Sequence, residues 1–293
     1  MLQHSDNLPA TSDRVVVIGA SGVLGKALID RLNTDKIPVL GLGSQQLDLL
    51  SPDAGDRLAD TLRAGDAVVL LSALTPDRGR GIPALMKNLR MAEAVCQAIT
   101  AVEPAHVIYL SSDAVYPMGT DVLTEQSPAA PTDLYGVMHR SRELMFGETV
   151  PADRLAILRC TLVLSAVDTH NSYGPNRFRQ QGRTDGKIGL GGEGEETRDH
   201  ILDSDVAEVI VRVLKQRSHG VLNTATGVSH SFADVARLVA ANLSPSPEVA
   251  FSPRHAPITH RHFDIRATRL AFPDLRFTPL EEAIQRVHAA LPS

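Results

Sequence analysis

The sequence predicts an α/β protein with a doubly wound parallel sheet and a smaller lobe formed by its C-terminal part. Two observations support this prediction. Short runs rich in β-branched residues alternate with amphipathic helical segments as far as Ser165, which is typical of strands joined by helices in a parallel sheet. Beyond Ser165 the pattern changes to long polar and glycine-rich segments. The chain has 293 residues, of which 43% are hydrophobic, so it can bury a large core.

The segment that organises the chain lies close to the N-terminus. Residues 15–18 read Val-Val-Val-Ile, which predicts a buried strand, and a helix with an apolar face follows. The glycines between them have the spacing G-x-x-G-x-x-G, which lets the backbone approach a pyrophosphate at the helix N-terminus. An ordinary tight turn is the alternative, but this context favours a Rossmann-like dinucleotide site. The predicted cofactor contacts here are Gly19, Ser21, Gly22, Val23, Leu24 and Gly25.

The second predicted strand, Ile37–Leu42, leads into a region that bears on the choice of dinucleotide. An acidic residue about 20 positions past the glycines usually holds the adenosine ribose of NAD. Residues 41–46 contain no Asp or Glu to repel the 2′-phosphate of NADP, and no Arg to bind it. The predicted cofactor is therefore NAD or NADP, with a slight preference for NADP. Asp48 and Leu49 are candidate contacts, although a solvated loop aspartate is an equally good interpretation of Asp48.

The rest of the dinucleotide-binding part continues the alternation. The predicted elements are a strand over residues 66–72, a helix over 82–99, a strand over 106–111, a helix that begins around 131–133 and a strand over 155–158. Ser72 and Ala73 end the first of these strands, where ligands bind in open parallel sheets, and are candidate cofactor contacts. Asn88 in the following helix is a further candidate, with simple solvation as its alternative.

The C-terminal part is expected to cover the substrate. Residues 168–178 and 186–194 are predicted as loops, and a helix that follows residue 203 is expected to be capped by Ser204 or Asp205. A strand over 221–225 and a helix over 231–243 come next. The predicted division is a disordered tail over 1–13, a dinucleotide-binding domain over 14–165, and a mainly substrate-binding lobe over 166–293 that is interleaved with that domain.

Composition excludes several classes of partner. The net charge of −5 and the absence of a Lys/Arg-rich run argue against nucleic acid. The longest apolar run, Ala67–Leu74, is too short to cross a membrane, and the polar N-terminus does not resemble a signal peptide. Cys96 and Cys160 lack the spacing of a disulfide framework or metal site, which suits a reducing compartment, so a cytoplasmic location is predicted. No metal is expected: the histidines at 255, 260 and 262 have no carboxylate or Cys at ligand spacing.

Taken together, these motifs resemble the extended short-chain dehydrogenase/reductase superfamily, over nearly the whole chain. The matching features, in order, are the glycine turn, Asn88, Ser111-Ser112-x-x-Val115-Tyr116, Tyr135 with its helix, Leu158-Arg159, Arg198-Asp199, Asp205-Val206-Ala207, Phe263-Asp264-Ile265 and Thr278-Pro279-Leu280-Glu281-Glu282. Their agreement in order makes the match specific.

The resemblance implies a mechanism. Tyr135 would act as general acid/base on a carbonyl or carbinol oxygen, Ser112 would hydrogen-bond that oxygen, and the nicotinamide would give or take a hydride. In the family, a Lys four residues after the Tyr favours the phenolate and holds the ribose. This sequence has His139 there instead. Three hypotheses follow: His139 substitutes for the Lys, another cation enters the site, or the protein binds cofactor without turnover. The adjacent Arg140 points about 100° further round the helix.

The resemblance also implies a substrate class. Arg198 lies where members that use nucleotide sugars place an arginine on the diphosphate, and the alternative is a salt bridge to Asp199, Asp203 or Asp205. Asn171 and Arg177 belong to a segment that resembles the family's N-x-Y-G-P loop, and they are candidate substrate contacts. Asp113 is another candidate. Because Ala114 follows it, rather than the Glu of the dehydratase branch, 4,6-dehydratase chemistry is not favoured.

The leading prediction is an NAD(P)-dependent epimerase or 4-keto reductase acting on a nucleotide sugar. Residues 46–64 faintly resemble the 4-keto-rhamnose reductase branch. The alternatives are a reductase of another small carbonyl compound and a non-catalytic NAD(P)-binding sensor. The family's usual homodimer would use the helices that bear Asn88 and Tyr135. An apolar stripe allows this, formed by Leu85, Leu89, Ala92, Val95 and Cys96, although the same stripe fits packing on the sheet.

Overall fold

A computed structural model describes residues 1–5, 12–79, 81–119, 121–167, 174–255 and 257–290. Within these residues the central sheet has six parallel strands in the order β10-β6-β4-β3-β1-β2. The strands are β1 (Arg14–Ile18), β2 (Val39–Leu42), β3 (Asp66–Leu70), β4 (His106–Ser112), β6 (Leu155–Cys160) and β10 (Gly220–Thr224). The chain runs from β1 to β2 on one side and then to β3 on the other. This reversal creates a crevice at the carboxyl ends of β1 and β3, where ligands bind in such sheets.

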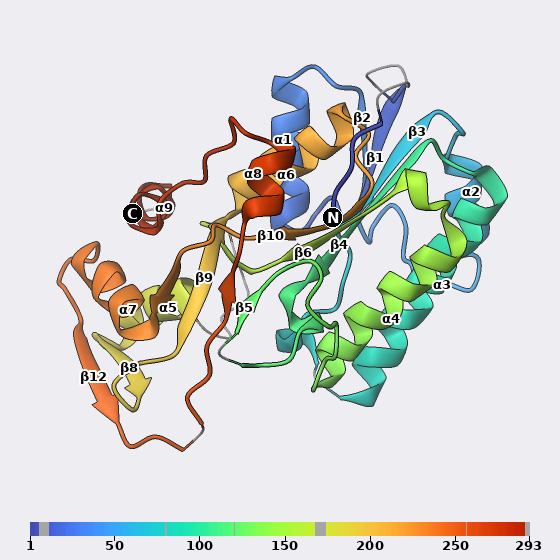
Figure 1. The fold of residues 1–293 in the computed structure, drawn as a ribbon. Helices are drawn as coiled ribbons and strands as arrows, with labels where there is room; N and C mark the ends of the chain where they lie inside the picture. The colour runs from blue at the N-terminus through green and yellow to red at the C-terminus, as the bar shows by residue number, and fades with distance from the viewer. Residues whose placement is uncertain (6–11, 80, 120, 168–173, 256, 291–293) are drawn as a thin grey trace.

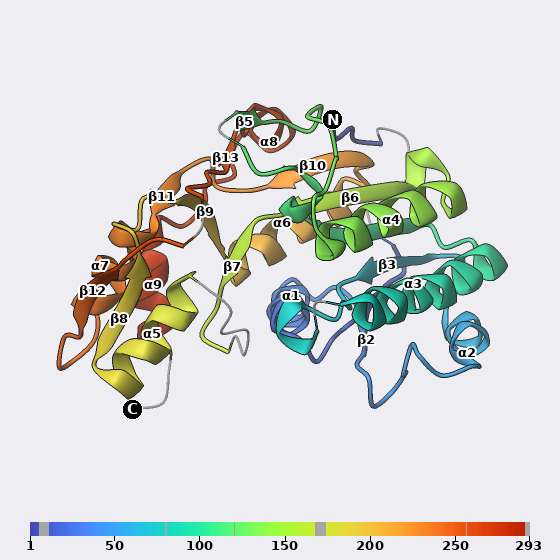
Figure 2. The same cartoon turned by 90° about the horizontal axis from the view of Figure 1, so that it is seen from below.

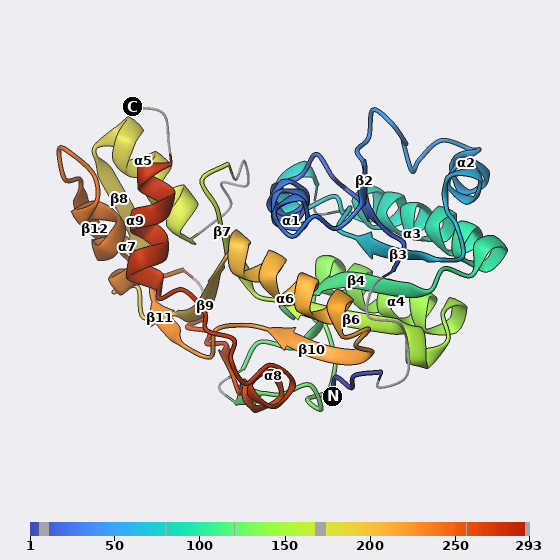
Figure 3. The ribbon, with the colours of Figure 1, turned by 90° about the horizontal axis from the view of Figure 1, so that it is seen from above.

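Helices cover both faces of the sheet, as a doubly wound fold requires. One face carries α2 (Ala54–Thr61), α3 (Ile82–Val102) and α4 (Leu134–Thr149), and Figure 2 shows α3 and α4 side by side. The other carries α1 (Val23–Thr34) and α6 (Asp203–Lys215), which Figure 3 shows next to each other. Val15 and Val17 pack on the α1/α6 side, whereas Val16 and Ile18 pack on the α3/α4 side. Burial on both faces explains why β1 is apolar throughout. The predicted fold class is confirmed.

The lobe lies beyond the carboxyl edge of the sheet, on the left of Figure 1. It contains β7 (Leu162–Leu164), β9 (Thr197–Leu202) and β11 (Ser229–Ser231) in one small sheet, and β8 (Lys187–Gly191) paired with β12 (Glu248–Ser252) in another. Its helices are α5 (Gly174–Asp185), α7 (Phe232–Ala241) and α9 (Leu280–Ala289). The chain leaves the lobe to form α6 and β10 and returns to it for β11, so the two parts are interleaved.

Short elements join these two parts. The 3-10 turns are η1 (Pro76–Arg78), η2 (Asp113–Val115) and η3 (Ala152–Arg154). β5 (Val122–Leu123) pairs with β13 (His262–Phe263), and α8 (Arg266–Ala271) packs against β10. No helix in the described part of the chain is both long and apolar enough to cross a membrane.

Part of the expected disordered tail is bound to the body of the protein. Gln3 forms a β-bridge with His219, and the His4 ring binds the Ser218 hydroxyl at 2.7 Å and the Ala271 carbonyl at 3.0 Å. Residues 1–5 thus pair with the segment before β10, a partner more than 200 residues away that no local pattern reveals. Residues 6–11 of the predicted tail lie outside the described residues.

Three local predictions for the chain beyond residue 165 were wrong. The expected loop over 186–194 contains β8, because Ile188 and Leu190 alternate with exposed residues and fill the lobe core. The expected loop over 168–178 is helical from Gly174 onward. Neither expected residue caps α6, whose N-cap is Leu202; Asp205 instead accepts hydrogen bonds from the Thr278 N–H and hydroxyl.

Candidate active site

The glycine turn of the sequence prediction is a close backbone packing between β1, α1 and the end of β3. Gly19 has φ +99°, and a Cβ there would lie 2.8 Å from the Ser72 backbone nitrogen. A Cβ at Gly25 would overlap the Gly19 carbonyl oxygen. Gly22 N-caps α1 without a side-chain hydrogen bond, so the N–H groups of the first turn face outward. This cradle fits a pyrophosphate, because backbone donors lie at a helix N-terminus with no side chain in the way.

The other predicted contacts in this segment differ in exposure. Ser21 and Gly22 are exposed, Val23 is half-buried, and Leu24 packs partly against the core. Beyond β2, the Asp48 carboxylate is exposed and accepts the Leu50 N–H at 3.0 Å.

The predicted cofactor contact Leu49 is buried in the core, so its side chain serves packing. A positive charge that was not predicted from the sequence lies against the loop after β2. Arg57 in α2 donates from Nη2 to the Gln46 carbonyl at 3.1 Å, because α2 folds back over this loop. An arginine thus stands beside the loop in which none was expected.

Asn88 shapes the segment that follows β3. It is buried, its amide nitrogen donates to the carbonyls of Leu74 and Ala84, and its Oδ1 accepts the Leu74 N–H at 2.8 Å. The predicted contact Asn88 therefore fixes the backbone beside Ser72 and Ala73, and its polar atoms are occupied in doing so.

Ser112 and Tyr135 are brought together by the docking of α4 against η2. Ser112 ends β4, and its hydroxyl oxygen accepts the Ala114 N–H at 3.1 Å. A Cβ at Gly136 would overlap the Ala114 carbonyl oxygen, so only glycine lets α4 approach so closely. Asp133 caps α4 by accepting the Gly136 N–H at 2.8 Å. Gly136 was not predicted, although it directly follows the candidate acid/base.

His139 is buried beside Tyr135. Their ring centroids are 4.7 Å apart with the rings nearly perpendicular, and His139 Nδ1 lies 2.7 Å from the Tyr109 hydroxyl. Burial, together with the nearby Arg142 charge, lowers the pKa of His139 to about 3. The imidazole is therefore neutral at pH 7. It can replace the hydrogen bond of the family's Lys but not its charge.

The charges around this pair fall into two groups. Arg140 donates to the buried Glu143 at 3.0 Å, and Arg159 binds both carboxylate oxygens of Glu143 at 2.8 and 2.9 Å. Arg140 is thus held in an ion pair with Glu143. Arg142 is fully buried and donates from Nη1 to the Ser72 carbonyl at 2.9 Å.

Asp113, predicted to contact substrate, anchors the C-terminal segment instead. Its carboxylate lies 3.2 Å from Arg261 Nη1, which also donates to the Asp113 carbonyl at 2.8 Å. Both side chains are buried. The pair ties the segment before β13 to η2 and so to the Ser112 turn.

Arg198 extends from β9 toward the segment that follows η2. Its guanidinium donates to the Thr259 carbonyl and hydroxyl at 2.7 and 2.6 Å, and its Nη2 lies 3.9 Å from Met118 Sδ.

The three carboxylates named as alternative partners of Arg198 accept hydrogen bonds from other residues. Asp199 accepts from Thr226 and Gly227, Asp203 from Ser165, and Asp205 from Thr278. Burial raises the pKa of Asp199 to about 6. Of the other substrate candidates, Arg177 is exposed in the first turn of α5, and Asn171 lies outside the described residues.

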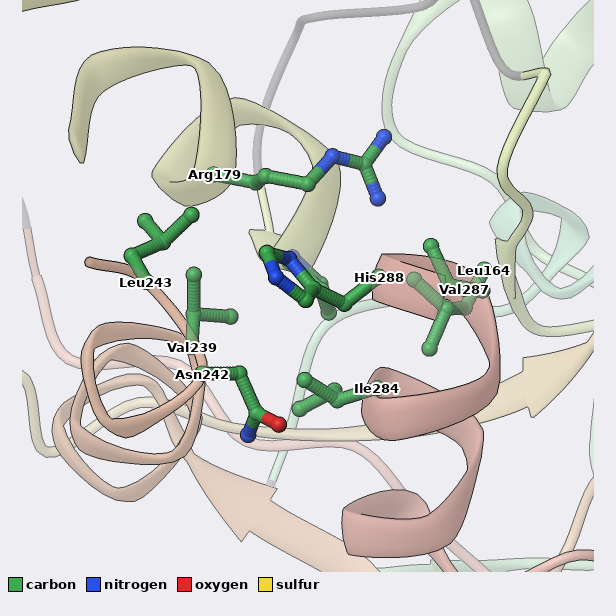
Figure 4. A pocket seen from close by; sticks show the side chains of 9 residues that line it. Leu164, Arg179, Val239, Asn242, Leu243, Ile284, Val287 and His288 are labelled. Carbon is green, nitrogen blue, oxygen red and sulfur yellow. The ribbon is translucent and has the colours of Figure 1, made fainter. Parts of the chain in front are cut away.

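Possible metal ligands and two cavities were compared with the position of this site. In the described chain, no group of three metal-ligating side chains is placed to hold a metal, and His260 and His262 both bind the Thr197 hydroxyl. Figure 4 shows a pocket between α5, α7 and α9 of about 10 Å³, which is no larger than a water site. A larger cavity of about 750 Å³ lies between β9, β11 and the segment around α8. Neither is lined by Ser112, Tyr135 or His139.

Comparison with known proteins decides the family. The model of the NAD dependent epimerase/dehydratase family matches residues 15–225, from β1 through β10. The chain belongs to the NAD dependent epimerase/dehydratase family. The family match covers the glycine turn, Ser112, Tyr135 and Arg198 together, so the resemblance seen in the sequence is confirmed.

The chain is similar to individual known proteins in sequence or in structure. A dTDP-4-dehydrorhamnose reductase of Mycobacterium tuberculosis is 31% identical over 133 residues, which are 42% of this chain and 40% of that relative. Among solved structures, a GDP-L-fucose synthetase from Naegleria fowleri bound to NADP has a TM-score of 0.83 at 16% identity, covering 98% of this chain and 97% of that one. A UDP-glucose 4-epimerase from Thermus thermophilus in complex with NAD has a TM-score of 0.80 at 18% identity, covering 94% and 98%. These two likenesses show the fold.

Proposed function

We propose that this protein is an NAD(P)-dependent epimerase or 4-keto reductase of a nucleotide sugar, with Tyr135 as its general acid/base. The observation that carries the proposal is the docking of α4 on η2, which sets Tyr135 beside the Ser112 turn at the same sheet edge as the glycine cradle. The family, and the reductase and epimerase among its similar members, support the reaction class.

The residues that would hold the dinucleotide come from three strands. Gly19–Gly25 and the first turn of α1 would bind the pyrophosphate, Ser72 and Ala73 would line its path, and Asp48 stands near the adenosine end. When bound, the nicotinamide accepts or donates the hydride. Arg57 beside the Gln46 carbonyl favours NADP, since a guanidinium binds a 2′-phosphate.

Proton transfer would fall to the side chains of η2 and α4. The Tyr135 hydroxyl exchanges a proton with the carbonyl or carbinol oxygen of the sugar. The Ser112 oxygen accepts the Ala114 N–H, and its hydroxyl proton has only a long 3.4 Å contact to Asp113 Oδ1. That proton is available to the substrate oxygen. His139 adds a neutral imidazole next to the phenol.

Arg198 would bind the substrate diphosphate. Its guanidinium reaches Met118, in the segment after η2 that also holds Tyr116. A planar guanidinium can bind two phosphate oxygens at once. Arg177 and Asn171 stay predictions as additional contacts.

Two further expectations stay predictions. For a homodimer through α3 and α4, Ala92 and Val95 of the expected stripe are buried in the core, whereas Ile82, Met86 and Leu144 are exposed. The exposed residues offer an apolar face for a second copy. A cytoplasmic location is the other.

The neutral His139 is the observation that favours the sensor alternative. A site without a cation near Tyr135 would bind a dinucleotide and turn over nothing. A reductase of another small carbonyl compound would keep the same Tyr135 chemistry and would not need Arg198.

Calorimetric titration with NAD, NADP and a panel of nucleoside diphosphates tests the proposal. Arg198→Ala is expected to weaken diphosphate binding at least about tenfold and to leave dinucleotide binding unchanged. Arg237→Ala, which removes an exposed arginine from α7, is the matched control and is expected to leave both unchanged. Dinucleotide binding without any diphosphate binding would contradict the nucleotide-sugar substrate.

A further inference from the structure

Arg142 is unusual among the buried arginines. In the described chain, three arginines are buried: Arg142, Arg159 and Arg261. Arg159 is paired with Glu143 and Arg261 with Asp113. Arg142 has no carboxylate within ion-pair distance among the described residues, and its Nε and Nη2 are buried without a hydrogen-bond partner. Burying an uncompensated charge is costly, so its retention indicates a use for that charge.

The position of Arg142 connects the cofactor cradle to the acid/base. Its Nη1 donates to the carbonyl of Ser72, the residue against which Gly19 packs. Its guanidinium carbon lies 5.1 Å from the centroid of the Tyr109 ring. Tyr109 in turn holds His139, whose ring meets that of Tyr135. Continuous contacts therefore lead from the cation to the phenol.

Tyr109 sets the proton position on His139. Burial raises the pKa of the Tyr109 phenol, so it stays protonated, and its proton needs an acceptor. The hydroxyl lies 2.7 Å from His139 Nδ1, and we assign this nitrogen as its acceptor. The neutral imidazole then carries its own proton on Nε2, a buried donor with no partner in the described chain.

We infer that two residues divide the work of the family's single Lys between them. Arg142 supplies, from beneath the site, the positive charge that favours the Tyr135 phenolate. Tyr109 fixes His139 as a neutral Nε2–H donor for a ribose hydroxyl of the dinucleotide. Arg142 and Tyr109 are positioning residues, because both act through other groups. The inference rests on the proposed role of Tyr135.

The surrounding charges leave the site positive. The charged and titratable groups that face it are Tyr109, Arg140, Arg142, Glu143 and Arg159, with Cys96 of α3 behind Arg142 and the Asp113–Arg261 pair at η2. Glu143 is opposed by two arginines, and Asp113 is balanced by Arg261. Arg142 is thus the buried charge of this group that no described carboxylate balances.

Spectrophotometric titration of tyrosinate tests the charge directly, in the protein without substrate. The chain has 4 Tyr and no Trp, so tyrosinate absorbance is read without an indole background. Subtracting the Tyr135→Phe titration isolates Tyr135. Arg142→Met is expected to raise the Tyr135 midpoint by about one pH unit, and Arg142→Lys is expected to keep it near the wild-type value.

Arg140→Met is the matched control, since it removes the same charge from the same helix. The Arg140 side chain is 36% exposed and paired with Glu143, so its loss is expected to shift the midpoint far less. An unchanged midpoint in folded Arg142→Met would overturn the role of Arg142. If that variant does not fold, Arg142→Gln gives the same test, with the same outcomes.

Dinucleotide affinity tests the second half of the inference. Tyr109→Phe removes the donor to Nδ1 and lets the His139 proton leave Nε2, so the Kd for NAD(P) is expected to rise about fivefold. Tyr116→Phe, which removes another buried hydroxyl away from His139, is expected to leave the Kd unchanged. Equal Kd values for wild type and Tyr109→Phe would overturn this role. Both tests succeeding while no nucleotide sugar turns over would contradict the proposed function alone.

Discussion

The glycine cradle and the Tyr135 centre lie at the same sheet edge but are built differently. In the cradle, backbone meets backbone: Gly19 packs on Ser72, and Gly25 on Gly19. In the centre, side chains from β4 and α4 meet around a buried imidazole, and Arg142 of α4 reaches the Ser72 carbonyl beyond β3. The cradle therefore depends on the absence of side chains, whereas the centre depends on charges and protons. Substitutions in the two regions should therefore affect stability, binding and activity in different ways.

The largest effect is expected where the centre itself relies on backbone packing. Gly136→Ala places a Cβ on the Ala114 carbonyl and forces α4 away from Ser112, which should cost about 3 kcal/mol of unfolding free energy and most of the activity. Denaturant unfolding measures the loss. Gly147→Ala is the control in the same helix, because a Cβ there meets nothing within 4 Å. It should stabilise the protein by about 0.5 kcal/mol. Equal effects of the two variants would refute the docking argument.

The next effect belongs to the cradle. Gly19→Ala combines a φ of +99° with a 2.8 Å approach to Ser72, and should cost about 2 kcal/mol and weaken dinucleotide binding. At Gly22 a Cβ would lie 3.3 Å from the Gly19 oxygen, with φ −74°. Gly22→Ala should therefore leave stability within about 0.5 kcal/mol of wild type while still reducing affinity, as thermal unfolding and calorimetry would show. A large stability loss in Gly22→Ala would contradict the claim that this substitution reduces dinucleotide affinity without straining the backbone.

Of these two regions, the centre is the one whose contribution to stability should depend on pH. The pKa of His139 is about 3 in the folded protein, below that of an unfolded His, so the unfolded chain binds more protons between these values. Its contribution to stability is present at pH 7 and is lost as pH falls toward 3. Between pH 7 and pH 5, the unfolding free energy of His139→Phe should therefore fall by about 2 kcal/mol less than that of the wild type. Ser21→Ala in the cradle should keep the wild-type pH dependence. Parallel curves for wild type and His139→Phe would contradict the neutral imidazole.

The smallest effect concerns the adenosine end of the cradle. Arg57→Ala should weaken NADP binding about fivefold and leave NAD binding unchanged, because only NADP carries the 2′-phosphate. Arg63→Ala, just after α2, is the control for general charge loss. Equal losses of affinity for NAD and NADP would show that Arg57 does not bind the 2′-phosphate.

The two regions also differ in how far the sequence reveals them. The cradle is contiguous, so strand, glycine turn and helix were predicted from residues 15–32 alone. Ser112, Tyr135 and His139 were predicted from the resemblance to the family's motifs. Gly136, Tyr109 and Arg142 were missed because their roles depend on tertiary packing. The helical spacing of Arg142, seven residues after Tyr135 and three after His139, was the available signal.

The errors elsewhere have the same cause. Residues 1–5 are held by partners near residues 216–219 and 271, which no local pattern reveals. Asp113 was predicted to contact substrate, but it is paired with Arg261, 148 positions further along the chain. In β8, two core residues between glycines gave too weak an alternation to predict a strand.

Rapid mixing tests the central claim most directly: that Tyr135 moves the proton while hydride moves at the nicotinamide. The complex with NAD(P) or its reduced form would be mixed with nucleotide hexoses and their 4-keto derivatives, and the absorbance of the reduced nicotinamide followed. In the wild type, the absorbance of the reduced nicotinamide should rise or fall after mixing. Tyr135→Phe should slow that change at least about 100-fold while binding the dinucleotide as tightly as wild type. No absorbance change in the wild type, or an undiminished rate in Tyr135→Phe, would contradict the account.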